Sequence, residues 1–353
     1  MISALYIAAG FALLVAGGDL LVRWASKLAA GLGISSMVIG LTVVAFGTSA
    51  PELAVSIAAA WKGNAEIALG NVVGSNIFNV LFILGLSACF APLVVQRSFL
   101  RRELPIMIGA SLSVWIFGLD GRIGPLEGGF LLAAAVGFTW WLVREGRNAP
   151  PAANLDAVTN VPLRPAVLPL VAGIGFSLVL LVAGSKLLVA GAVAVAQSFG
   201  VSELVIGLTI VAAGTSLPEV AASVAATLRG ERDIAIGNVV GSNIFNILAV
   251  LGGSSLLAPA GMPVSPVAMG FDIPVMMAVA LLCLPVFMSG GQVSRLEGVL
   301  FLALYGGYTA LLVFTSRQPD FDRMGLLVGS IGLIGLVVAW EFIRARSRTN
   351  RST

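Results

Sequence analysis

The chain has 353 residues, of which 58% are hydrophobic and only 10% are charged, and its mean hydropathy is +1.02. Soluble domains carry about 25% charged residues, so this composition excludes a soluble globular protein and indicates a polytopic membrane protein. The formal net charge is +3, and the basic residues lie between apolar runs, where membrane orientation explains them better than a nucleic-acid partner does.

Apolar runs of about 20 residues, each long enough to cross a bilayer, follow one another along the whole chain. Because a helix satisfies its own backbone groups in lipid, we expect an all-α fold. The predicted spans lie near residues 3–27, 34–60, 65–92, 104–119, 124–143, 167–197, 202–227, 233–258, 271–289, 295–315 and 324–343. The sequence therefore predicts ten core spans and an eleventh, C-terminal one.

The distribution of Lys and Arg predicts the orientation. With the N-terminus outside, fifteen basic residues fall at cytoplasmic ends: Arg23, Lys27, Arg97, Arg101, Arg102, Arg144, Arg147, Arg164, Arg229, Arg232, Arg295, Arg344, Arg346, Arg348 and Arg351. Four fall outside: Lys62, Arg122, Arg317 and Arg323. Cytoplasmic loops carry the excess of basic residues, so we expect the N-terminus outside and the C-terminus in the cytoplasm.

The sequence contains an internal duplication. Residues 40–79 and 207–246 align without gaps at an offset of 167, and 27 of the 40 positions are identical. Five spans in each copy is an odd number, so the second copy has to be inverted relative to the first, as in many secondary transporters. We expect repeat 1 at residues 1–145, a short cytoplasmic linker at 146–166, repeat 2 at 167–316, and an extra span with a basic tail at 317–353.

Each repeat contains a proline and a glutamate inside a span, in "GTSAPE" from Gly47 and "GTSLPE" from Gly214. A proline removes the hydrogen bond to the carbonyl four residues earlier, so we expect free carbonyls near Gly47 and Gly214. Such backbone at membrane depth has to be buried in protein or to line a polar cavity. We therefore expect a bound ion to satisfy these carbonyls.

Polar side chains accompany each glutamate at helical spacing. Thr48, Ser49 and Glu52 share one helix face, and Asn71, Ser75 and Asn79 form a polar stripe on the next span. The second copies are Thr215, Ser216, Glu219, Asn238, Ser242 and Asn246. Serine and asparagine in membrane helices often serve only packing, but a charged residue there is costly and marks a functional site by default.

The candidate ligands are all oxygen atoms, and the chain has no histidine. This set suits Ca²⁺ or Na⁺ rather than transition metals, and it suits Mg²⁺ less well. Two glutamates carry a charge of −2, which one Ca²⁺, two Na⁺ or two protons would neutralise. We expect no cofactor, no obligatory protein partner and no enzymatic activity, because no nucleotide-binding loop is present and no nucleophile is paired with a base.

The motifs "GTSAPE…GNVVGSNIFN" and "GTSLPE…GNVVGSNIFN" resemble the paired alpha-repeats of the cation/calcium antiporter superfamily, specifically its prokaryotic sodium/calcium exchanger branch. The resemblance implies two inverted five-helix halves, an ion site on spans 2, 3, 7 and 8, and sliding of spans 1 and 6. It implies cation ligation by these residues: Glu52, Glu219, Asn79, Asn246, Thr48, Ser49, Thr215, Ser216, Ser75, Ser242, and the backbone carbonyls near Ala45 and Ala212. Several exchangers have aspartate where this chain has Asn79 or Asn246, which leaves stoichiometry and any K⁺ requirement open.

These observations predict a Ca²⁺/Na⁺ antiporter in the bilayer of a prokaryotic inner or plasma membrane, working by alternating access. The alternative is a Ca²⁺/H⁺ antiporter, or another cation/proton antiporter, that uses the same site, with each glutamate taking a proton. A channel lined by the polar stripe and an intramembrane enzyme are the rivals from other classes. Inverted repeats favour alternating access over a channel.

Overall fold

The computed structural model describes residues 2–148, 167–200, 206, 210, 212–258, 260–288 and 290–317. The predicted linker beyond Asn148, the start of the span predicted at 202–227, and the whole predicted eleventh span lie outside the described residues. The described residues are almost entirely helical, which confirms the predicted all-α class.

The chain forms two compact units, and each unit contains segments of both sequence repeats. Unit 1 comprises Met1–Pro51 and Ala134–Ser242, and unit 2 comprises Glu52–Ala133 and Asn243–Thr353. The described helices and π-helical turns that begin in unit 1 are α1 (Ile2–Leu32), α2 (Ser36–Ile39), η1 (Gly40–Val44), α3 (Ala45–Thr48), α4 (Ala50–Trp61), α10 (Val167–Ser198), α12 (Ala212–Gly214), α13 (Leu217–Leu228) and α14 (Arg232–Phe245).

The remaining described elements begin in unit 2. They are α5 (Ala65–Phe78), η2 (Asn79–Leu84), α6 (Gly85–Phe90), β1 (Leu93–Val94), α7 (Arg97–Arg101), α8 (Glu103–Phe117), β2 (Arg122–Ile123), α9 (Pro125–Asn148), η5 (Asn246–Leu251), α15 (Gly252–Leu257), β3 (Met262–Pro263), η6 (Ala268–Asp272), α16 (Ile273–Met288), β4 (Gln292–Val293) and α17 (Arg295–Arg317). Helices α4, α9 and α14 each cross a unit boundary.

Within the described residues, seven helices are long and apolar enough to cross a membrane, and an eighth span results if the bent pair Ser36–Thr48 and Ala50–Trp61 counts as one. The bend of 45° follows from Pro51, as a proline breaks the helical hydrogen-bond ladder. The spans predicted at 104–119 and 202–227 contain shorter helices: α8 has 15 residues and α13 has 12. The protein is an integral, multi-pass membrane protein.

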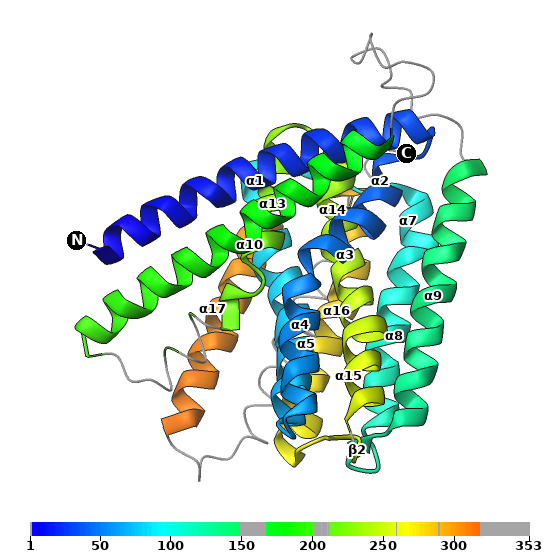
Figure 1. Cartoon of the computed structure of the whole chain (residues 1–353). Coiled ribbons are helices and arrows are strands. Elements are labelled where there is room, and N and C mark those ends of the chain that lie inside the picture. The colour runs from blue at the N-terminus through cyan, green and yellow to red at the C-terminus, as the bar shows by residue number, and fades with distance from the viewer. Residues whose placement is uncertain are drawn as a thin grey trace. The chain divides into compact units, whose positions relative to one another are not determined.

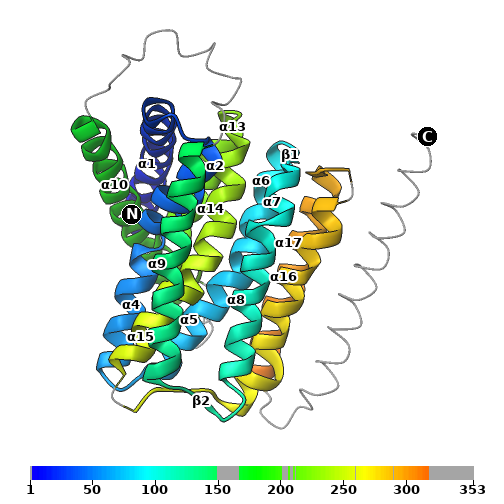
Figure 2. The same ribbon diagram turned by 90° about the vertical axis from the view of Figure 1, so that its right-hand side faces the viewer.

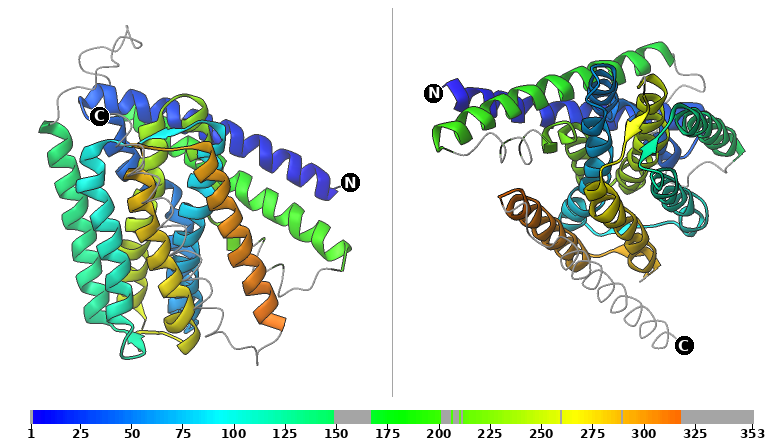
Figure 3. Two further views of the ribbon diagram at one scale, coloured as in Figure 1. Left: turned by 180° about the vertical axis from the view of Figure 1, so that it is seen from behind. Right: turned by 90° about the horizontal axis from the view of Figure 1, so that it is seen from below.

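The first helices of the two repeats, α1 and α10, pack along each other within unit 1 (Figure 1; Figure 3, left). A Cβ atom on Gly10 would lie 2.5 Å from the Leu188 nitrogen, whereas one on Gly191 would lie 2.8 Å from the Ser3 carbonyl oxygen. Residues early in α1 thus meet residues late in α10, so the two helices are antiparallel. Since they are equivalent by the repeat offset, this packing confirms the predicted inversion.

Unit 2 places α8 beside α16 and α6 beside α17 (Figure 2). Gly85 of α6 approaches Gly298 of α17, where an added Cβ would lie 2.9 Å from the Gly298 carbonyl oxygen. Small residues permit this close approach of helix backbones in a membrane protein. Two antiparallel pairs of very short strands, β1 with β4 and β2 with β3, join loops at the helix ends, and the second pair is visible from below (Figure 3, right).

Asp19 of α1 forms ion pairs within unit 1. Its carboxylate lies 3.0 Å from the Arg23 guanidinium and also contacts Arg229, the residue that caps the C-terminus of α13. The side chains of Asp19 and Arg229 are 37% and 32% exposed. This pair therefore links α1 to the end of α13 at a partly exposed position.

Candidate cation site

Both intramembrane glutamates lie in the first turn of a helix, Glu52 in α4 and Glu219 in α13. Their side chains are each only 1% exposed. In each helix a proline precedes the glutamate, and proline is tolerated in a first turn because its missing N–H has no helical partner there. The helix N-terminus also stabilises a nearby negative charge. The repeated helix break thus creates two helix N-termini, each with a buried carboxylate in its first turn.

Side chains of repeat 1 hold Glu219 within unit 1. Ser49 Oγ donates to Glu219 Oε1 at 3.0 Å. The other oxygen, Glu219 Oε2, is buried and has no hydrogen-bond partner among the described residues. One oxygen of the carboxylate is therefore oriented by the protein, and the other is available to a cation.

Asn238 ties the glutamate-bearing helix α13 to α14. Its Nδ2 donates to Ser223 Oγ at 2.9 Å and to the Glu219 carbonyl at 3.4 Å, and its Oδ1 accepts from Thr48 Oγ1 at 3.1 Å. In unit 2, Asn71 Nδ2 donates in the same way to Ser56 Oγ at 2.9 Å. The first asparagine of each predicted polar stripe thus holds the helix that carries the glutamate.

The carbonyls released by proline do not all remain free. In repeat 2 the Gly214 carbonyl, which Pro218 cannot bond, accepts a hydrogen bond from Ser185 Oγ of α10. The Ala213 carbonyl accepts from the Ser216 backbone N–H at 3.2 Å. The prediction that proline leaves the Gly214 carbonyl free is therefore wrong, because a side chain from a neighbouring helix donates to it.

The remaining candidate ligands are buried, with one exception. Thr215 is half-buried, whereas the following side chains are at most 5% exposed: Thr48, Ser49, Ser75, Asn79, Ser216, Ser242 and Asn246. Asn79 Oδ1, Asn246 Oδ1 and Ser242 Oγ are buried without a hydrogen-bond partner among the described residues. The Ala45 carbonyl accepts from Ser49 N–H at 3.0 Å, and Ala212 begins α12.

The candidate ligands divide between the two units. Unit 2 holds Glu52, Ser75, Asn79 and Asn246, and unit 1 holds Ala45, Thr48, Ser49, Ala212, Thr215, Ser216, Glu219 and Ser242. Each unit thus contains one buried carboxylate and several uncharged oxygen donors. Both units contain hard oxygen ligands of the kind that Ca²⁺ and Na⁺ take.

Five polar residues that hold the candidate ligands and their helices were not predicted from the sequence: Ser56, Ser223, Asn76, Asn243 and Ser185. Ser56 and Ser223 are identical in the two repeats, as are Asn76 and Asn243, so their recurrence at the offset of 167 was the available signal. Ser185 has no such signal, because the equivalent residue in repeat 1 is Gly18.

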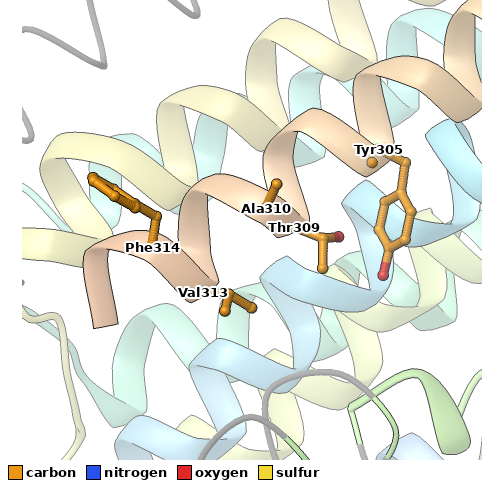
Figure 4. Close-up of a pocket in the computed structure, with 6 residues that line it drawn as sticks. Tyr305, Thr309, Ala310, Val313 and Phe314 are labelled. Carbon is orange, nitrogen blue, oxygen red and sulfur yellow. The ribbon is translucent and has the colours of Figure 1, made fainter. Parts of the chain in front are cut away.

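A cavity of about 570 Å³ lies in unit 2 along α17, and none of the candidate ligands is among the residues that line it. Its lining residues are mostly apolar: Tyr305, Gly306, Thr309, Ala310, Val313 and Phe314 (Figure 4). None of these side chains carries a charge at neutral pH, so the cavity does not suit a cation.

The model of the family described as "Sodium/calcium exchanger protein" matches residues 2–144 and 169–314. The chain belongs to this family. Its two matched segments correspond to the two repeats, and its family consists of membrane antiporters, which confirms the predicted class of transporter rather than enzyme.

Several prokaryotic relatives match over nearly their entire length. The chain is 42% identical to the putative antiporter CaxA of Alkalimonas amylolytica, over 88% of this chain and 99% of that one. It is 33% identical to the sodium/calcium exchanger MaX1 of Methanosarcina acetivorans, over 89% and 99%. It also resembles a solved structure of the sodium-calcium exchanger NCX_Mj, with a TM-score of 0.76, 32% identity, and coverage of 88% of this chain and 99% of that one.

Proposed function

We propose that this sodium/calcium exchanger family member moves Ca²⁺ across the membrane against Na⁺, and that Glu52 and Glu219 together bind the transported cation. The observation that carries the proposal is the buried Glu219 carboxylate, whose Oε1 is held by Ser49 and whose Oε2 has no partner among the described residues. A charged side chain in the middle of a membrane helix costs about 2.5–3.5 kcal/mol, and a bound cation would offset this cost by neutralising the carboxylate.

The proposed ligand set consists of the two carboxylates, uncharged side-chain oxygens and backbone carbonyls. The side chains are those of Asn79, Asn246, Thr48, Ser49, Thr215, Ser216, Ser75 and Ser242, and the carbonyls are those near Ala45 and Ala212. Ca²⁺ takes about six to eight oxygen ligands in flexible geometry, which a mixed set of this kind supports. The charge of −2 balances one Ca²⁺ or two Na⁺, so the two ions would compete for the same carboxylates.

Alternating access requires elements that move past the site, and we propose α1 and α10 for this role. The two helices are antiparallel and pack through glycines, which leave few interlocking side chains between their backbones. Gly18 of α1 also approaches α13, where an added Cβ would lie 2.7 Å from the Ala221 carbonyl oxygen. Contacts with few interlocking side chains favour sliding of α1 and α10 along their neighbours.

We also propose the domain boundaries that the sequence predicts. They are repeat 1 at 1–145, a linker at 146–166, repeat 2 at 167–316, and an extra span with a tail at 317–353. The proposal also includes a prokaryotic inner or plasma membrane location, an outside N-terminus and a cytoplasmic C-terminus. A fluorescent protein fused to the C-terminus tests the orientation, because it becomes fluorescent in the cytoplasm. The orientation would be the reverse if this fusion is dark in the cell and a separate C-terminal fusion to alkaline phosphatase is active in the periplasm.

The test of the function is ⁴⁵Ca²⁺ uptake into proteoliposomes loaded with Na⁺, compared with liposomes that carry only a pH gradient. We expect uptake to need internal Na⁺ and to be abolished in Glu52→Gln. Glu66→Gln is the matched control, because Glu66 is an exposed residue in the first turn of the next helix.

Uptake driven by a pH gradient without Na⁺ would assign the site to Ca²⁺/H⁺ exchange instead. A requirement for K⁺ together with Na⁺ would show a third coupling ion. Ca²⁺ conductance without any countertransport would indicate a channel and contradict the proposal.

A further inference from the structure

We infer that Asn76 and Asn243 are positioning residues for the transported cation. They fix the amide orientation of Asn79 and Asn246, so that the carbonyl oxygen rather than the NH₂ group of each amide is left for the cation. All four asparagines belong to unit 2. The inference rests on the proposed function, because it assigns a role to residues that act on two proposed ligands.

A backbone carbonyl fixes the orientation of the Asn243 amide. Asn243 Nδ2 donates to the Asn76 carbonyl oxygen at 3.2 Å. A backbone carbonyl only accepts hydrogen bonds, so the amide of Asn243 has to face it with nitrogen. The chemistry of the main chain therefore settles which end of the Asn243 side chain is Nδ2 and which is Oδ1.

The orientation of the Asn243 amide then determines that of Asn79, one of the proposed ligands. Asn243 Oδ1 accepts a hydrogen bond from Asn79 Nδ2 at 3.0 Å. Since Asn243 presents an acceptor, Asn79 has to present its donor. Asn79 Oδ1 is consequently turned away from Asn243, and it is the buried atom that has no hydrogen-bond partner among the described residues.

The same sequence of hydrogen bonds, from a backbone carbonyl through one asparagine amide to the next, occurs a second time with the repeats exchanged. We call each of these sequences a relay. Asn76 Nδ2 donates to the Asn243 carbonyl at 3.2 Å, and Asn76 Oδ1 accepts from Asn246 Nδ2 at 3.2 Å. Asn246 Oδ1 is again a buried oxygen without a partner among the described residues. Asn76 and Asn243 are equivalent at the repeat offset of 167, as are Asn79 and Asn246, so the arrangement arises twice from the same local sequence.

Among the described residues, the other contacts of these two amide nitrogens are weak. The remaining contact of the Asn76 amide nitrogen is Met276 Sδ at 3.8 Å, and that of the Asn243 amide nitrogen is Met107 Sδ at 3.7 Å. Thioether sulfur is a weak acceptor, so these contacts do not reorient the amides. The relay is thus held by two backbone carbonyls and ends on two unpartnered carbonyl oxygens.

The relay also determines what suits positions 79 and 246 in this chain. An aspartate at position 79 would place a carboxylate oxygen against Asn243 Oδ1, which is an acceptor, and Asn243 is prevented from turning by the Asn76 carbonyl. An asparagine fits without conflict. Asn76 and Asn243 therefore act on cation affinity through the amides of Asn79 and Asn246, with no contact to the ion themselves.

The experiment measures Na⁺-driven ⁴⁵Ca²⁺ uptake as a function of Ca²⁺ concentration for wild type, Asn243→Leu, Asn79→Asp and the double variant. Asn64→Leu is the matched control, because Asn64 is exposed and its side chain makes no capping hydrogen bond. Thermal unfolding in detergent, with and without Ca²⁺, reports folding and binding separately from transport.

We expect Asn243→Leu to raise KM for Ca²⁺ by about threefold to tenfold, the equivalent of one lost hydrogen bond, while Vmax changes less. Asn79→Asp alone should raise KM, whereas Asn79→Asp in the Asn243→Leu background should lower it relative to Asn243→Leu. A carboxylate presents an oxygen whichever way it turns, so it no longer needs the relay once the opposing acceptor is removed. A merely structural role of Asn243 would not produce this change of sign.

While wild type still transports Ca²⁺, the inference is overturned by a KM within twofold of wild type for folded Asn243→Leu, or by an equal effect of Asn79→Asp in both backgrounds. Asn76→Leu repeats the test on Asn246 if Asn243→Leu does not fold, and Asn79→Asp alone contradicts the inference if it lowers KM. Absence of transport and of Ca²⁺-induced stabilisation in wild type would instead contradict the proposed function.

Discussion

Ser49 of repeat 1 donates a hydrogen bond to the carboxylate of Glu219 in repeat 2, with 3.0 Å between Ser49 Oγ and Glu219 Oε1. Both side chains are at most 1% exposed, so water does not replace this bond when it is lost. The two sequence repeats therefore share one of the two proposed carboxylate ligands: one repeat supplies the charge and the other orients it.

Ser49→Ala tests this orientation. We expect KM for Ca²⁺ to rise about tenfold, because a hydrogen bond to a charged group is worth about 1.5–3 kcal/mol. Ca²⁺-dependent uptake kinetics in proteoliposomes measure the change. Ser198→Ala is the control, since Ser198 is exposed and bonds only the Val195 carbonyl of its own helix. Equal KM values for Ser49→Ala and the control would contradict the assigned role.

Ser185→Ala tests the carbonyl that Pro218 leaves without a helical partner. Removing the hydroxyl leaves the buried Gly214 carbonyl without its donor, so we expect a loss of about 1–3 kcal/mol in the free energy of unfolding. Thermal unfolding in detergent measures it. Ser177→Ala on the same helix should have a smaller effect, because Ser177 bonds the Gly173 carbonyl one turn away. The interpretation fails if both variants unfold at the same temperature.

Gly10→Ala tests the antiparallel contact of α1 with α10. The added Cβ would lie 2.5 Å from the Leu188 nitrogen, which is backbone and has to move, so we expect a destabilisation of about 1–3 kcal/mol and less transport. Gly175→Ala in α10 is the control, because nothing lies within 4 Å of the Cβ that it would add. Wild-type stability and uptake in Gly10→Ala would show that the two helices are not in close contact.

Asp19→Asn tests the ion pairs between α1 and the end of α13. The pairs are partly exposed, so their removal should change the free energy of unfolding by less than about 1 kcal/mol, with a smaller effect at high salt. Unfolding temperatures at low and high salt measure this for Asp19→Asn, Arg229→Gln and the double variant. A large, salt-independent loss would mean that Asp19 is buried and has a role at the site.

The sequence alone predicted the architecture, because hydropathy and duplication are properties of the chain itself. Runs long enough to cross a bilayer predicted the helices, and the odd number of spans in each repeat predicted the inversion that α1 and α10 display. It also singled out Glu52 and Glu219, since a carboxylate in an apolar span stands out without any knowledge of its neighbours.

Only the tertiary structure decided which polar groups are satisfied by the protein. Ser185 and Gly214 belong to different helices, so no local pattern predicts that this hydroxyl reaches the carbonyl that we expected to bind an ion. The amide orientation of Asn79 likewise depends on Asn243, a residue 164 positions away. Sequence reveals which donors and acceptors a helix carries. Their pairing depends on short distances between helices, and these distances exist only in the packed molecule.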